Sequence, residues 1–128
     1  HGGFLTYVHT DTPLDAIVST MALHHLPDFW KQEALYRLAS FLKPGGRFLL
    51  ADVVFSEKEY EAHIARWMED MTAQVGADMA PDLESHLCTE FSTFTWIMEG
   101  LLDRAGFRID EAEYSKGVLA RYLCTRTV

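Results

Sequence analysis

The sequence predicts an α/β fold in which two parallel strands are extended by an antiparallel hairpin, with helices on both faces of the sheet. The runs at 15–19 and 47–55 are strongly apolar, and the first shows no polar alternation, which is typical of strands covered on both faces. Apolar residues recur at helical spacing between them, so a right-handed crossover should make the two strands parallel. A tight turn at 115–117 separates two final strands.

The composition fits one domain and excludes several classes of partner. Apolar residues make up 48% of the 128 positions, which is enough to form a core. The net charge of −8 disfavours a nucleic-acid backbone, since phosphate binding requires a positive field. No apolar run approaches the roughly 20 residues that span a bilayer, so we expect no membrane partner. No signal peptide is visible, and we expect a cytoplasmic protein with Cys88 and Cys124 as reduced thiols.

The first strand and helix have clear boundaries in the sequence. The strand at 15–19 follows Pro13, and Asp28 is a suitable N-cap for the helix, since its carboxylate can accept bonds from free backbone N–H groups. The segment 43–46 (KPGG) should stop that helix, because proline cannot continue it. The apolar stripe of this helix consists of Trp30, Ala34, Leu35, Leu38, Phe41 and Leu42.

Three more helical segments are predicted after the second strand. Ser56 and Glu59 have the spacing of a capping box, so a helix should start there and run to Gly76. A short helical stretch follows at 82–87, and a further helix should be capped by Ser92 or Thr93 and closed by Gly106. The chain then ends in antiparallel strands at about 107–114 and 118–125.

Two motifs, in order and at suitable spacing, resemble a known family. The segment 22–28 (ALHHLPD) follows the first strand, and 42–46 (LKPGG) precedes a second strand that ends in Asp52. Together with 104–107 (RAGF) before the terminal hairpin, they resemble class I S-adenosylmethionine (SAM)-dependent methyltransferases from Asp15 onward. The resemblance implies a Rossmann-like half-domain, with residues 1–128 as a single domain that forms the C-terminal portion of the family fold.

The resemblance also implies a missing part. The family's first strand ends in a glycine-rich loop that approaches the cofactor, and its second ends in an acid for the ribose; this sequence has neither. The segment 2–4 (GGF) resembles the end of the family's third strand. In the family's sheet order the strand 15–19 lies beside the missing first strand. We therefore expect its edge to be covered by the N-terminal residues, a separate N-terminal fragment or a second copy in a homo-oligomer such as a dimer.

The segment after the first strand holds the candidate cofactor and catalytic residues. The resemblance implies SAM as cofactor, with contacts, mainly through backbone, from Ser19, Thr20, Met21, Ala22 and Leu23. His24 and His25 are the catalytic candidates, because a histidine can take a proton from a hydroxyl or amine. The alternative is a packed histidine bonded to nearby backbone, since many methyltransferases act mainly by proximity. No metal is expected, because adjacent residues rarely point at one ion and no third ligand is obvious.

Asp52 and Trp67 are the candidate substrate residues. Asp52 ends the second strand at the same edge of the sheet, where it could touch substrate or orient a positive group; a solvated acid or cap is the alternative. Trp67 belongs to an apolar helical stripe, which forms core more often than pocket, although in the family this region often covers substrate.

Three functions are consistent with the sequence. The first is SAM-dependent methyl transfer to a small-molecule acceptor, completed by the missing N-terminal segment. The second is a non-catalytic methyltransferase-like module that acts through protein–protein contacts or dimerisation. The third is an unrelated small α/β binding domain, against which the two motifs in tandem argue.

Overall fold

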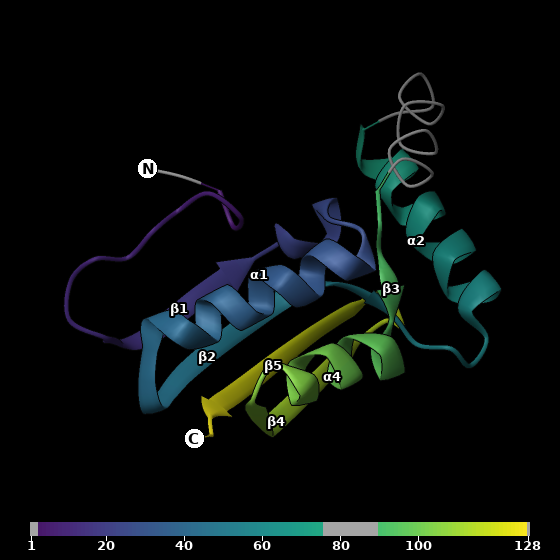
Figure 1. Cartoon of the computed structure of the whole chain (residues 1–128). Helices are drawn as coiled ribbons and strands as arrows, with labels where there is room; N and C mark the ends of the chain where they lie inside the picture. The colour runs from purple at the N-terminus through teal and green to yellow at the C-terminus, as the bar shows by residue number, and fades with distance from the viewer. Residues whose placement is uncertain (1–2, 76–89, 128) are drawn as a thin grey trace.

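The computed structural model describes residues 3–75 and 90–127 (Figure 1). The expected helix at 82–87 and Cys88 therefore lie outside the described residues. In chain order the elements are β1 (Leu14–Thr20), the 3-10 turn η1 (Leu23–His25), α1 (Asp28–Phe41), β2 (Leu42–Phe55), α2 (Tyr60–Val75), β3 (Thr93–Phe94), α4 (Thr95–Arg104), β4 (Phe107–Ser115) and β5 (Leu119–Arg126).

The strands form an open mixed sheet in the order β1-β2-β5-β4. β1 pairs with β2 in parallel, from Ala16 against Arg47 to Thr20 against Ala51. β5 lies antiparallel between β2 and β4, and the short β3 adds to the end of β2 in parallel. The predicted parallel pair and terminal hairpin are thus confirmed. No helix of the described residues is both long and apolar enough to cross a membrane.

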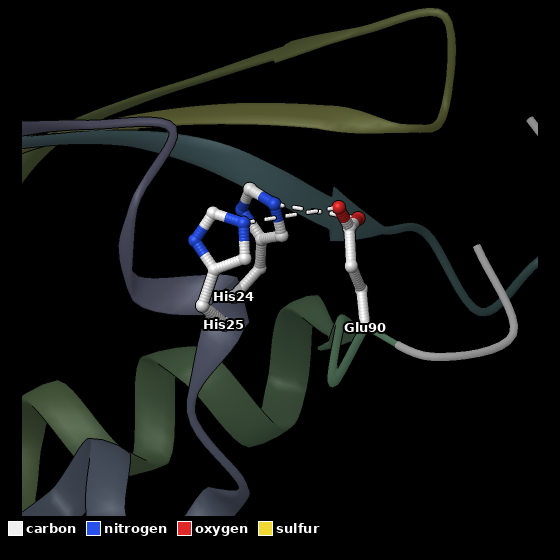
Figure 2. Close-up of side chains that lie close together, drawn as sticks. All are labelled: His24, His25 and Glu90. Atoms are coloured by element: carbon white, nitrogen blue, oxygen red, sulfur yellow. Dashed lines mark ion pairs between the residues drawn. The ribbon is translucent and has the colours of Figure 1, made fainter. Parts of the chain in front are cut away.

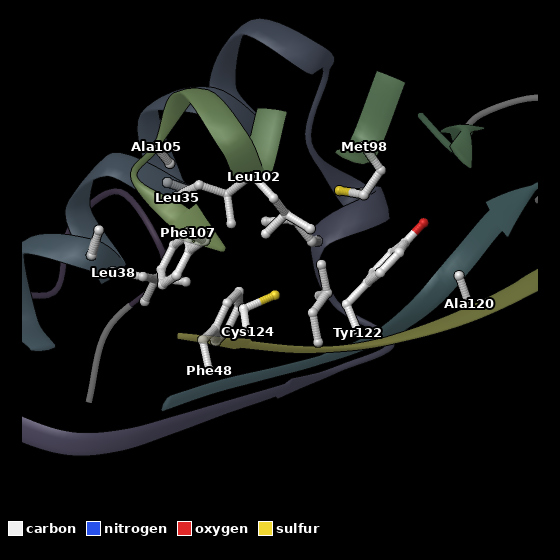
Figure 3. Packing of buried hydrophobic residues seen from close by; sticks show 14 of the residues in the cluster. Leu35, Leu38, Phe48, Met98, Leu102, Ala105, Phe107, Ala120, Tyr122 and Cys124 are labelled. Carbon is white, nitrogen blue, oxygen red and sulfur yellow. The ribbon is translucent and has the colours of Figure 1, made fainter. Parts of the chain in front are cut away.

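One face of the sheet carries the hydrophobic core. α1 and α4 both lie on this face, above β2 and β5 (Figure 1). Successive strand residues point to opposite faces, so Phe48 and Leu50 of β2 face the helices together with Tyr122 and Cys124 of β5. Figure 3 shows Phe48, Tyr122 and Cys124 packed on one side of the ribbon. The rings of Phe48 and Phe107 lie 5.0 Å apart there.

The opposite face of the sheet has no helix over it among the described residues, although the sequence predicts helices on both faces. Val18 pairs with Leu49 and points to this side, where 65% of its surface is exposed. The helix α2 lies beyond the carboxyl end of β2 rather than over the sheet (Figure 1). The apolar residues of β1 on this side therefore form a surface that the described residues do not cover.

The outer edge of β1 is likewise unpaired within 3–75 and 90–127, because β1 pairs only with β2 there. The N-terminal residues lie against α1 instead. Arg37 Nε donates to the carbonyl of Phe4 at 3.2 Å, and the ring of Tyr7 packs edge-on against Phe41 at 5.6 Å. Which partner covers this edge stays a prediction.

Helix starts are where the sequence predictions are wrong. α2 begins at Tyr60, and Glu59 has a left-handed φ of 55°, so Ser56 and Glu59 form no capping box. α4 begins at Thr95 after Phe94, and Thr93 pairs with Val54 in β3 instead of capping the helix. α1 begins at Asp28 itself, one residue earlier than an N-cap would require.

The predicted stop after α1 is confirmed, and glycine is required there. The chain turns from helix to extended backbone at Leu42, and Gly45 has a φ of 83°. A Cβ on Gly46 would lie 2.9 Å from the carbonyl oxygen of Lys43 and 3.2 Å from that of Asp15. The backbone of this turn therefore leaves no space for a side chain at position 46.

The terminal hairpin also forms as predicted. Lys116 and Gly117 both have positive φ values, 55° and 72°, as the two central residues of a type I′ turn require. The N–H of Val118 donates to the carbonyl of Ser115 at 3.2 Å and closes the turn.

Gly46→Ala should destabilise the fold by about 1–3 kcal/mol, because the new methyl group meets backbone atoms that cannot move independently. Gly100→Ala is the matched control. Gly100 lies inside α4 near only the flexible end of Arg104, so alanine there should be neutral or stabilise by about 0.5–1 kcal/mol. Urea unfolding of both variants measures the difference, and equal stability of Gly46→Ala and the parent would contradict this explanation.

Alkaline pH should weaken the fold partly through Cys124. Burial raises the pKa of this thiol from an ordinary 9.0 to about 12, so the folded chain holds a proton that the unfolded chain releases. Stability from this group is complete below pH 9 and is lost as pH rises toward 12, by at most about 1.4 kcal/mol per pH unit. Cys124→Ala should therefore show a shallower loss of unfolding free energy across this range. Val118→Ala, a core variant that removes no titratable group, should keep the parent's slope.

Candidate functional site

The candidate site lies where the parallel strands β1 and β2 end. Ligands of open α/β sheets bind outside the carboxyl ends of their strands, and η1 is the connection that leaves β1 at this point. Three parts of the chain meet here: η1, the end of β2 at Asp52, and the residues just before β3.

Asp52 is the buried anchor of this site. Its carboxylate accepts a bond from His24 Nδ1 at 2.5 Å, from the backbone N–H of His24 at 3.2 Å and from that of Val53 at 2.8 Å. The side chain has no exposed surface, so it is not a solvated acid. Its role is to fix the ring of His24. A contact between Asp52 and substrate stays a prediction.

His24, His25 and Glu90 form a polar cluster at this end of the sheet, and Figure 2 shows both rings beside the carboxylate. His24 Nε2 lies 3.3 Å from Glu90 Oε2, and His25 Nε2 lies 3.8 Å from Glu90 Oε1. The second ring nitrogen of His25, Nδ1, lies 3.2 Å from the carbonyl of Ala22. Each histidine is thus bonded through Nδ1 and turns Nε2 toward Glu90.

Lys31 holds the chain before β3 in place. Its ammonium donates to the carbonyls of Leu26, at 2.6 Å, and Phe91, and to Asp28 Oδ1 at 3.2 Å. Burial lowers the pKa of Lys31, while the hydrogen bond and charge of Asp28 oppose that shift. The N–H of Phe91 in turn donates to the carbonyl of His24 at 2.9 Å, so the chain beside Glu90 is tied to η1.

A groove of about 370 Å³ runs along the same end of β1. Ser19 lines it, and the hydroxyl of this buried residue has no hydrogen-bond partner among the described residues. The lining consists of Gly3, Phe4, Tyr7, Ile17, Val18, Ser19, Thr20, Ala22, Leu38 and Phe41.

The structure places the predicted cofactor residues in three different surroundings. Ser19, Thr20 and Ala22 line the groove. Met21, with a left-handed φ of 54°, lines a second hollow of about 290 Å³ that also touches Asp52, whereas Leu23 is fully buried in the core.

Trp67 is not joined to the cluster by any described contact. Its ring packs against Phe55 with centroids 6.3 Å apart, at the start of the connection from β2 to α2. A contact between Trp67 and substrate stays a prediction.

Sequence reasoning missed Glu90 and Lys31. Glu90 lies in no motif, and only its position beside η1 reveals it. Lys31 lies between Trp30 and Gln32 in a helix, and a lysine is usually solvated. The proximity of Asp28 along the helix was the one signal available for it.

Comparison with known proteins shows what this chain resembles in sequence and in fold. The chain is 35% identical over 112 residues to an uncharacterized methyltransferase of Geobacillus kaustophilus, which covers 88% of this chain. The fold matches human N-acetylserotonin methyltransferase in complex with SAM, with a TM-score of 0.64, 18% identity and 99% of this chain covered. In sequence the chain resembles proteins named methyltransferases, and in fold it resembles SAM-dependent methyltransferases. No family model matches the chain.

A second methyltransferase structure shows the same fold. Magnesium protoporphyrin IX methyltransferase from Synechocystis, with bound S-adenosylhomocysteine, matches 98% of this chain with a TM-score of 0.61 and 13% identity. The match covers 49% of that protein, and 33% of the human enzyme. The chain likewise spans about half the length of the curated relatives it matches, 49% for the Geobacillus protein.

Lys31→Met should loosen the site and weaken the fold. Methionine keeps the length of the buried side chain but leaves the carbonyls of Leu26 and Phe91 without their donor. Two unsatisfied buried acceptors should cost about 2–5 kcal/mol of unfolding free energy. Amide hydrogen exchange should also show faster exchange of the Phe91 N–H. As a control, Lys43→Met at the exposed start of β2 should change stability by less than about 0.5 kcal/mol. Unchanged exchange at Phe91 would contradict the tethering role of Lys31.

Proposed function

We propose that this chain, completed by the remaining strands of the family fold, transfers a methyl group from SAM to a small-molecule acceptor. Two features carry the proposal: the groove at the end of β1, and His24, which follows the groove-lining Ala22 by two residues and is held by a buried carboxylate. The resemblance in fold supports it, as do the methyltransferase names of its relatives. Neither source supports the non-catalytic alternative.

The groove fits the cofactor in its polar and apolar character. Ser19 offers a buried hydroxyl without a partner among the described residues, which a ligand's polar atom would satisfy. Phe4 and Tyr7 supply apolar and aromatic surface on the other side of the groove. Ser19, Thr20 and the backbone at Ala22 would hold the cofactor, which supplies a methyl group already activated on a sulfonium sulfur.

His24 is the residue best placed to take the proton of an acceptor hydroxyl or amine. Asp52 accepts from Nδ1, so the base would act through Nε2, the nitrogen that faces Glu90. Asp52 touches no reacting atom in this scheme and acts as a positioning residue. His25 is more exposed and bonded only to backbone through Nδ1, so it would assist at the rim.

The proposal assigns a partner to the unpaired edge of β1 and to the bare face of the sheet. Both would receive the remaining strands and helices of the family fold, from a longer chain or a separate fragment. The length of the relatives, about twice the matched region, supports this assignment over pairing between two copies.

Calorimetry with SAM and S-adenosylhomocysteine tests the function. A chimera that joins this chain to the N-terminal half of the Geobacillus kaustophilus relative should bind SAM with a Kd below about 100 μM, roughly −5.5 kcal/mol. The isolated chain should bind more weakly, because one wall of the groove is open. No binding by either protein would overturn the proposal.

The role of His24 is tested in the same chimera by release of S-adenosylhomocysteine with a panel of small hydroxyl and amine acceptors. His24→Asn should lower kcat by about 10²–10⁴-fold and leave SAM affinity unchanged. His9→Asn, a histidine remote from the cluster, is the matched control and should keep full activity. Equal activity of the two variants would leave methyl transfer standing but remove His24 as the base.

A further inference from the structure

We propose that His24, His25 and Glu90 form a binding site for one divalent metal ion of the zinc class. The two histidines are neighbours in η1, and Glu90 comes from the chain just before β3. The fold therefore brings Glu90 to the histidines (Figure 2). This site goes beyond the proposed methyl transfer, and no step of that reaction depends on it.

The separations of the ligand atoms suit a single small ion. His24 Nε2 and His25 Nε2 lie 3.3 Å and 3.8 Å from the two oxygens of Glu90, and one ligand atom from each residue lies within 4.8 Å of the others. In a tetrahedral site with bonds of about 2.0–2.2 Å, ligand atoms are about 3.3–3.6 Å apart. The cluster therefore needs only a small contraction to hold an ion.

The hydrogen bonds of the two rings determine which nitrogens are available. Nδ1 of His24 faces the carboxylate of Asp52, and Nδ1 of His25 faces the carbonyl of Ala22. Both partners are acceptors, so each Nδ1 carries a hydrogen and Nε2 is the nitrogen left for a ligand. The two Nε2 atoms and the carboxylate of Glu90 lie within 4.8 Å of one another, so a cation there would replace any Nε2 proton and bind all three groups.

This pattern is that of a metal site with its supporting shell in place. Histidines that bind metals usually donate their other ring N–H to a carboxylate or a backbone carbonyl, which fixes the ring and its tautomer. His24 has the first kind of support and His25 the second. Lys31 adds to this support by holding Phe91, the neighbour of Glu90.

The ligand set and its exposure indicate the kind of ion. Two imidazoles and one carboxylate favour Zn²⁺ over Mg²⁺ and Ca²⁺, which prefer oxygen ligands. The side chains of His24 and Glu90 are 6% and 15% exposed, whereas that of His25 is 60% exposed. The site thus opens to solvent beside His25, which leaves a fourth position for water or another ligand.

Metal binding and proton uptake use the same lone pair of His24. An occupied site would therefore withdraw this nitrogen from the base role proposed above, and the two states can be separated by experiment. The test of the metal site uses Zn²⁺ alone, without SAM or acceptor. Its failure leaves methyl transfer untouched, and loss of methyl transfer leaves the metal site untouched.

Isothermal titration of the chelator-treated 128-residue chain with ZnCl₂ tests the proposal. One ion should bind per chain with a Kd below about 10 μM. His25→Gln and Glu90→Gln should each weaken binding at least about 100-fold, since losing even a supporting partner costs about 10–100-fold. His9→Gln is the matched control and should bind zinc as the parent does. No saturable binding, or unchanged binding by both variants, would overturn the site.

A measurement on the parent chain avoids any effect of the variants on folding. Long-range ¹⁵N–¹H NMR of the imidazoles should show that Zn²⁺ shifts Nε2 of His24 and His25 while both Nδ1 atoms stay protonated. Shifts confined to other histidines would assign the bound zinc elsewhere and reject this site.

Discussion

The hydrogen bonds of Asp52 are the interaction on which the rest of the site depends. A carboxylate without exposed surface is costly to bury, and three N–H donors offset this cost. Two of these donors belong to His24, so the same bonds that make Asp52 tolerable in the interior also attach η1 to the end of β2. The ring position of His24 is therefore a consequence of satisfying a buried charge. A site residue built in this way is held by the stability of the sheet itself.

Lys31 is a second buried charge, and its hydrogen bonds hold the chain before β3 in place. Its buried ammonium is stabilised by three oxygen acceptors, and the charges of Asp28 and Asp52 favour its protonated form. Because Phe91 is one of those acceptors, the buried cation holds the chain beside Glu90, while the buried anion of Asp52 holds His24. The cluster combines parts of the chain that are far apart in sequence, and two buried charges fix their separation.

The sequence predicted those features that depend on neighbouring residues. β1, the end of α1 and the terminal hairpin follow from apolar runs, from the glycines at 45 and 46 and from the turn at 116–117, all of which act locally. The predicted starts of α2 and α4 were wrong because contacts distant in sequence determine where these helices begin. Thr93, for example, pairs with Val54 in a strand. Asp52 and His24 were each selected from sequence, but their bond was not, since strand pairing brings them together. Glu90 gave no local signal at all.

The two halves of the site differ in how completely this chain encloses them. The polar cluster is surrounded by η1, β2, α1 and the chain at 90–91, and its supporting bonds are made by described residues. The groove, in contrast, follows the outer edge of β1, where backbone groups have no ladder partner among the described residues, and Val18 exposes most of its surface. Proton and metal chemistry at the cluster therefore depend on contacts already present. Tight binding in the groove depends on the surface that completes the sheet. Completing the sheet should therefore raise ligand affinity in the groove without changing how firmly the His24 ring is held.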